Sequence, residues 1–180
     1  MVPVDDRERS ELFEQTVLPH LDSAYNLARW LAGNDHDAQD IAQEASLRAF
    51  KYLGSFRGDN PRSWLLSVVR NSFYTWLRKN RPTEKMVEMT DDILDLEDPS
   101  GGVETLNPQF ADADAVRRAI AELPVEFREI VILREMEGFS YKEIAELADV
   151  PIGTVMSRLA RARKLLQKGL TAAFKPGDQR

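Results

Sequence analysis

Three polar side chains in the first third of the chain, Asp40, Gln43 and Glu44, are spaced i, i+3 and i+4. In an α-helix this spacing places them on one face. Two carboxylates and an amide on one helix face present negative charge and hydrogen-bond acceptors, which suit a basic helix of a protein partner. A solvated polar helix face would show the same pattern, so the spacing alone leaves both interpretations open.

Amide, phenol and guanidinium groups recur along a second segment at positions that a helix brings to one side. They are Asn71, Tyr74, Arg78 and Arg81. Groups of these kinds suit exposed bases and the phosphates between them, through stacking and charge-assisted hydrogen bonds. The segment also contains Trp64 and Trp76, for which we expect burial in the core.

A basic surface is expected near the end of the chain, because residues 151–175 contain lysine and arginine but no acidic residue. A helix over this segment has a narrow apolar stripe, formed by Val155, Leu159, Ala162 and Leu166. Hydroxyls and cations occupy the opposite side and its flanks, at Thr154, Ser157, Arg158, Arg161 and Lys164. Arginine can bond two acceptors on a guanine edge, whereas lysine and hydroxyl groups suit phosphates. The alternative is an amphipathic surface helix with a solvated basic face.

Residue types that carry covalent or metal chemistry are scarce. The chain has no cysteine, and His20 and His36 are its only imidazoles. Disulfides, thiolate nucleophiles and cysteine–histidine zinc sites are therefore excluded, and no nucleophile–base pair or phosphate-binding glycine loop is visible. We expect no enzymatic activity, no catalytic residue, no cofactor and no metal.

Membrane insertion is not expected either. The longest apolar runs, such as residues 130–133, fall far short of the roughly 20 residues that a membrane span requires. The N-terminus is acidic and lacks the basic start and apolar core of a signal peptide. The expected location is the cytoplasm.

Charge and composition divide the chain, whose net charge is -6, into two domains. Residues 48–85 and 151–175 are basic, whereas residues 86–116 carry acidic side chains and no basic one. Two basic regions separated by an acidic one suggest two surfaces for a polyanion. Residues 83–109 are acidic, contain proline and glycine and lack any sustained period, so we expect a flexible linker between domains at 1–82 and 110–175.

Both domains are expected to be helical, because neither shows the alternation of β-branched residues typical of strands. In the first, an apolar stripe runs over residues 12–31 and ends at Gly33. A second helix over residues 35–52, capped by Asp35 or Asp37, would turn four apolar side chains inward. These are Ile41, Ala45, Leu47 and Phe50. A third helix follows over residues 61–79.

In the second domain, helices are expected over residues 113–123 and 126–137. Ser140 and Glu143 then form a capping box that opens a helix ending near residue 148. A turn at residues 149–151 leads to the last helix, over residues 152–170. Two helices joined by a tight turn, the second of them basic, are typical of a helix-turn-helix. The predicted fold class is therefore all-α, with two small helical domains.

The second domain resembles region 4 of the extracytoplasmic-function sigma factors, in the sigma-70 superfamily. The resemblance rests on FREIVILRE at 127–135, GFSYKEIAE at 138–146 and VPIGTVMSRLARARK at 150–164. It covers nearly all of residues 113–170 and implies that the last helix reads the −35 promoter element. Many relatives carry a basic residue at the position where this chain has Met156.

The first domain resembles region 2 of the same family. The resemblance rests on DIAQE at 40–44 and FRGDNPRSWL at 56–65. It implies that Asp40, Gln43 and Glu44 bind the coiled coil of the largest polymerase subunits. It further implies that the loop with Arg57 and Asn60 helps to hold a base flipped from the −10 element. Stacking and hydrogen bonds to the flipped base would offset the cost of taking it out of the base stack.

The resemblance implies a promoter-specificity subunit whose partners are core RNA polymerase, promoter DNA and an anti-sigma factor. A sigma-like decoy that sequesters an anti-sigma factor without touching DNA is the alternative, and it would not need the DNA-facing side chains. A dimeric helix-turn-helix regulator would need a dimerisation or ligand-binding domain in place of residues 1–82.

Overall fold

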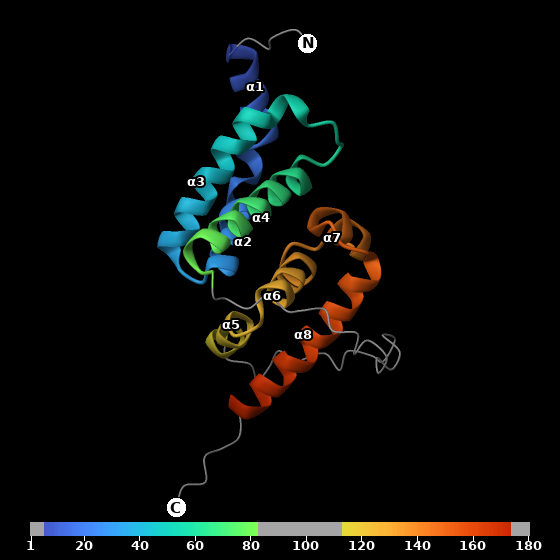
Figure 1. Cartoon of the computed structure of the whole chain (residues 1–180). Coiled ribbons are helices and arrows are strands. Elements are labelled where there is room, and N and C mark those ends of the chain that lie inside the picture. Colours follow the sequence, from blue (N-terminus) through green and yellow to red (C-terminus); the bar gives the residue numbers. More distant parts are fainter. Residues whose placement is uncertain (1–5, 83–112, 174–180) are drawn as a thin grey trace, which may run out of the picture. The chain divides into compact units, whose positions relative to one another are not determined.

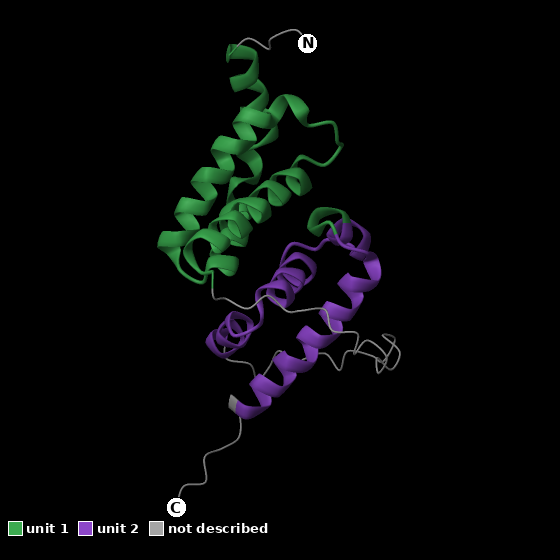
Figure 2. Cartoon of the chain, in the orientation of Figure 1, with its two compact units in different colours: residues 1–84, 146–149 green, residues 85–145, 150–180 purple. Residues whose placement is uncertain are grey.

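The computed structural model describes residues 6–82 and 113–173, and within these ranges the chain forms helices and no strand (Figure 1). The prediction of an all-α protein is confirmed. The chain divides into two compact units, residues 1–84 with 146–149 and residues 85–145 with 150–180 (Figure 2). The predicted linker, residues 83–109, lies outside the described residues.

Over residues 6–82, the first unit forms four α-helices: α1 (Asp6–Thr16), α2 (Leu21–Ala32), α3 (Asp35–Tyr52) and α4 (Pro61–Asn80). Helices α2, α3 and α4 pack against one another, and α1 contacts α3. The stripe over residues 12–31 belongs to two helices, because a 3-10 turn at Leu18–His20, with Pro19 in its first positions, separates them. Apolar side chains from the last three helices are fully buried, among them Leu27, Leu31, Ile41, Leu65 and Phe73.

The junction between α2 and α3 differs in one respect from the expectation. Gly33 ends α2 in the left-handed conformation, with φ of 81°. The N-cap of α3 is Asn34, whose side chain accepts a hydrogen bond from the N–H of Asp37 at 2.9 Å. The prediction that Asp35 or Asp37 is the cap is therefore wrong. Both lie in the first helical turn, where their negative charge is favourable at the positive end of the helix dipole.

The second unit contains α5 (Ala113–Ala121), α6 (Val125–Val131), α8 (Ile152–Ala173) and the first part of α7 (Tyr141–Ala148), whose residues 146–148 are grouped with the first unit. Helix α8 packs on α5 and α6. A short π-helix, Ile132–Met136, continues α6 and ends before Gly138, whose φ is 73°. The predicted helix over residues 126–137 is thus present, but its second half has π rather than α geometry.

The boundaries of α7 and α8 follow from local hydrogen bonds. The predicted capping box is confirmed, since the Ser140 N–H donates to Glu143 Oε2 at 2.8 Å and the Glu143 N–H donates to Ser140 Oγ at 3.2 Å. Asp149 then adopts a positive φ of 54°, and Pro151 immediately precedes α8. The predicted apolar stripe of α8 is buried, at Val155, Leu159, Ala162 and Leu166. In the described part of the chain, no helix combines the length and the apolar character that crossing a bilayer would need.

Candidate macromolecular interfaces

The three polar side chains Asp40, Gln43 and Glu44 all lie on the exposed side of α3. Asp40 Oδ2 lies 3.8 Å from Nε2 of His36, one turn earlier. Glu44 Oε1 accepts a hydrogen bond from Nε of Arg48 at 2.6 Å, one turn later. These carboxylates keep about half of their side-chain surface exposed, 59% for Asp40 and 51% for Glu44. An acidic, solvent-facing strip on a long helix can accept hydrogen bonds from a basic partner.

The strip continues into a shallow depression that the sequence did not predict. The depression has a volume of about 410 Å³ and is lined by Glu44, Leu47, Arg48, Lys51 and Tyr52. Leu47 was expected to face inward, but it is 63% exposed. Its position three residues after Glu44 and four after Gln43 places it on the same face, and this spacing could have identified it. An exposed leucine beside charged groups adds an apolar contact to the acidic strip.

The expected face of α4 is only partly open. Asn71 and Arg78 are exposed, but Tyr74 is only 6% exposed. The guanidinium of Arg70 lies 4.6 Å from the centroid of the Tyr74 ring, and the Phe73 ring packs against that ring at 5.3 Å. The prediction that Tyr74 shares an open face with Asn71 and Arg78 is therefore wrong, because its side chain is buried. Arg81 is also engaged within the first unit, with Asp37 of α3.

The loop before α4 presents one exposed cation and one helix cap. The Nη1 group of Arg57 donates to the carbonyl of Gly54 at 2.8 Å, and its side chain is exposed. Asn60 is the N-cap of α4, and its Oδ1 accepts a hydrogen bond from the Ser63 N–H at 3.0 Å. The amide oxygen of Asn60 thus fixes the start of α4, about three turns before Asn71.

The side of α8 that is predicted to contact DNA, here called the reading face, holds four accessible side chains and one that is nearly buried. Lys164 is exposed, and Thr154, Arg158 and Arg161 are half-buried. Ser157 is only 9% exposed, and its hydroxyl donates to the carbonyl of Thr154 at 3.1 Å. The expectation of an open Ser157 hydroxyl is therefore wrong, because the serine bonds back to its own helix, as serines within helices often do.

Two contacts outside the reading face fix α8 and the helix on which it rests. Nη2 of Arg163 donates to Glu135 Oε1 at 2.9 Å and ties α8 to the π-helix. Arg134 of the same π-helix donates to the carbonyl of Phe139 at 2.9 Å, beside the start of α7. A capped short helix, a tight turn and a longer basic helix with one buried side define a helix-turn-helix protein of the DNA-binding class.

Comparison with known families identifies both units. Residues 16–83 match the family model "Sigma-70 region 2", and residues 113–166 match "Sigma-70, region 4". The chain belongs to the extracytoplasmic-function sigma factors, which are specificity factors of transcription initiation rather than catalysts.

Curated relatives match along most of the chain. It is 33% identical to the RNA polymerase sigma-H factor of Pseudomonas aeruginosa, over 88% of this chain and 86% of that protein. It is 30% identical to the ECF RNA polymerase sigma factor SigW of Bacillus subtilis, over 89% of each. The match to SigE of Mycolicibacterium smegmatis is 32% identical and covers 90% of this chain, which spans 63% of that relative's length.

Among solved structures, the sigma factor RpoE of Bartonella quintana, determined in complex with the anti-sigma factor NepR, aligns with a TM-score of 0.67. The two chains are 28% identical, and the alignment covers 88% of this chain and 96% of RpoE. CnrH, determined with the cytosolic domain of CnrY, shares the fold at 21% identity and a TM-score of 0.60.

Proposed function

We propose that this chain binds core RNA polymerase through the α3 strip and directs it to promoters that α8 recognises. The observation that carries the proposal is the presence of two surfaces of opposite charge in one chain, each suited to a different partner. Helix α3 exposes Asp40, Gln43 and Glu44, and α8 turns Arg158, Arg161 and Lys164 away from its buried stripe. An acidic strip suits a basic protein helix, and a basic recognition helix suits a major groove.

On DNA, the two units would bind different elements. In the second unit, Arg158 and Arg161 would read base edges at the −35 element, while Thr154 and Lys164 would contact phosphates. The Ser157 hydroxyl, already bonded to its own helix, would support the backbone of α8 rather than read a base.

In the first unit, the exposed side chains beside the −10 element would be Arg57, Asn71 and Arg78, with Asn60 shaping the loop. Tyr74, with its ring already packed, would act by supporting this face. The proposed domains are residues 1–82 and 110–175, joined by residues 83–109.

An anti-sigma factor is the third proposed partner. The solved structure of RpoE from Bartonella quintana contains one, and that protein shares 28% of its sequence with this chain. The exposed Leu47 beside the acidic strip supplies apolar surface of the kind that the core of a protein interface buries.

Run-off transcription with core polymerase tests the proposal. We expect specific transcripts only when the chain is added, and we expect Asp40→Ala with Glu44→Ala to weaken co-purification with core polymerase while helicity is retained. A chain that binds an anti-sigma factor but yields no specific transcript would be a decoy. Wild-type co-purification of the double variant would reject the assignment of the α3 strip.

A further inference from the structure

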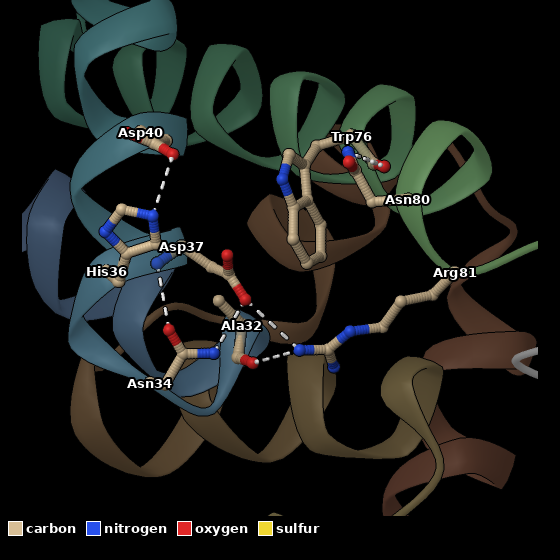
Figure 3. A network of polar contacts seen from close by, with 8 residues as sticks. All are labelled: Ala32, Asn34, His36, Asp37, Asp40, Trp76, Asn80 and Arg81. Carbon is tan, nitrogen blue, oxygen red and sulfur yellow. Dashed lines mark hydrogen bonds and ion pairs between the residues drawn. The ribbon is translucent and has the colours of Figure 1, made fainter.

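Arg81 follows the end of α4 and contacts two other helices of the first unit (Figure 3). Its Nη2 group lies 3.4 Å from the carbonyl oxygen of Ala32, the last residue of α2, and 3.2 Å from Asp37 Oδ2 in the first turn of α3. The guanidinium also lies over the ring of Trp76, 5.1 Å from its centroid. One side chain thus connects the ends of α2, α3 and α4.

Asp37 is held from a second side by the N-cap residue. Asn34 Nδ2 donates to the same Asp37 Oδ2 at 2.7 Å, and the Asp37 N–H donates to Asn34 Oδ1 at 2.9 Å. The Asp37 side chain is 23% exposed and that of Arg81 is 41% exposed. We refer to Ala32, Asn34, Asp37 and Arg81 as the Arg81 cluster.

The electrostatics of the helix ends explain why this arrangement is favourable. The C-terminus of α2 presents carbonyl oxygens and partial negative charge, which attract a cation, whereas the N-terminus of α3 repels one. The carboxylate of Asp37 offsets this repulsion and lets a single guanidinium bridge both ends. Without that bridge, the first turn of α3 would keep its Asn34 cap and the ion pair of Asp35 with Arg29 at 2.6 Å, but it would lose its contact with the residue that ends α4.

The Arg81 cluster lies one turn before the acidic strip. Asp40 follows Asp37 by three residues, on the same helix, and Figure 3 shows His36 and Asp40 beside the cluster. In an α-helix the Asp40 N–H bonds to the carbonyl of His36 in the first turn, so fraying of that turn would remove this bond and loosen Asp40 relative to Gln43 and Glu44.

We propose that Arg81 is a positioning residue for the polymerase-binding strip: it holds the first turn of α3 so that Asp40 is presented together with Gln43 and Glu44. This inference rests on the proposed function of that strip. It also gives Arg81 a role different from the DNA contact that its place in the sequence suggested. The residue lies immediately before the segment that joins the two units.

Amide hydrogen exchange in the free, full-length chain tests the first half of the inference. The protected amides of the first turn are those of Asp37, bonded to Asn34 Oδ1, and Ala38, bonded to the Asn34 carbonyl at 3.2 Å. Arg81→Gln should speed their exchange by about two- to fivefold, the size expected of a partly exposed ion pair. Lys79→Gln removes an exposed cation from the same last turn of α4 and should leave these amides unchanged.

Core polymerase affinity, measured well below the unfolding temperature of every variant, tests the second half. Arg81→Gln should bind core about two- to fivefold more weakly than wild type, and Arg81→Lys should restore part of the loss because lysine keeps the charge but not the fork geometry. Asp37→Asn should cost less core affinity in the Arg81→Gln background than in the wild-type chain, since the contact between the two residues is already gone. A purely structural role would lower the melting temperature without changing the affinity of the folded chain.

The reference variant Asp40→Ala with Glu44→Ala separates the ways in which the inference can fail. Unchanged exchange in Arg81→Gln would show that the cluster does not hold the first turn. Wild-type core affinity of Arg81→Gln, with weakened binding of the reference variant, would overturn the positioning role and leave the proposed function intact. Wild-type affinity of both variants would overturn the polymerase-binding strip, and the positioning role with it.

Discussion

Replacing Arg128 with methionine should destabilise the second unit selectively. Arg128 lies in α6 and is only 8% exposed. Its guanidinium donates to the carbonyls of Ile120 at 3.3 Å, Ala121 at 2.6 Å and Leu123 at 2.9 Å. Ile120 and Ala121 end α5 and Leu123 lies in the turn that follows, where helical N–H donors run out, although the Ile120 carbonyl also accepts the Leu123 N–H at 3.1 Å. Arg128 therefore caps α5 and joins it to α6.

The magnitude follows from these bonds. Each hydrogen bond to a charged group contributes about 1.5–3 kcal/mol, and desolvation of a buried ion offsets several kcal/mol of the sum. The net loss on removing Arg128 should be about 3–5 kcal/mol, because each buried carbonyl that loses its donor costs about 1–3 kcal/mol. A unit of ~60 residues has roughly 3–9 kcal/mol of stability in total. We therefore expect Arg128→Met to lose at least about a third of the stability of the second unit.

The placement of the tryptophans makes the effect measurable unit by unit. Trp30, Trp64 and Trp76 are the only tryptophans, and all three belong to the first unit. In urea titrations, tryptophan fluorescence should give the wild-type transition for Arg128→Met, whereas circular dichroism should show earlier loss of helix. The same variant should still bind core polymerase but lose transcription that depends on the −35 element.

The control is Arg118→Met, which removes an exposed cation of α5 and should change neither signal. The reasoning on Arg128 would be refuted by a loss below about 1 kcal/mol, because a loss that small is the net contribution of one ordinary hydrogen bond. An equal shift of the fluorescence transition would contradict the assignment of the effect to the second unit.

The remaining predictions concern DNA recognition and the helix-turn-helix turn. On promoters randomised at the −35 element, Arg161→Ala should relax one base preference by about 1–3 kcal/mol, whereas Lys164→Ala should weaken all promoters alike and flatten the salt dependence; unchanged preferences in Arg161→Ala would contradict this. Asn71→Ala with Arg78→Ala should reduce transcription more from duplex promoters than from templates already opened at the −10 element, and equal losses would argue against a role in strand opening. Asp149→Gly should raise the free energy of unfolding of the helix-turn-helix by up to about 1 kcal/mol, because its φ of 54° is strained for a side chain but not for glycine; chemical denaturation checks this, with Asp149→Ala expected to be destabilising.

Structural features that depend only on residues close together in the chain were predictable from the sequence. The Ser140–Glu143 capping box formed as expected, because both of its hydrogen bonds span three residues. The apolar stripe of α8 was predictable because one helix has one strongly apolar side. The family was recognisable for a related reason, since its motifs are short continuous segments that the matched regions, residues 16–83 and 113–166, contain.

The candidate interfaces were predictable only in part, because a residue's place on a helix does not say what covers it. Asp40, Gln43 and Glu44 are exposed as their spacing suggested, and so is Lys164. Tyr74 has the same spacing relation to exposed neighbours, yet its ring is packed.

The sequence by itself thus determined the helical class, most helix boundaries, the buried side of α8 and the family, through signals that act within a few residues. Tertiary structure decided which polar and apolar side chains remain accessible. It exposed Leu47 and closed off Tyr74, because packing depends on which helices meet. It also engaged Arg81 with Asp37, 44 positions earlier in the chain. Pairing over that separation depends on how α2, α3 and α4 fold against one another, and no local pattern in the sequence encodes it.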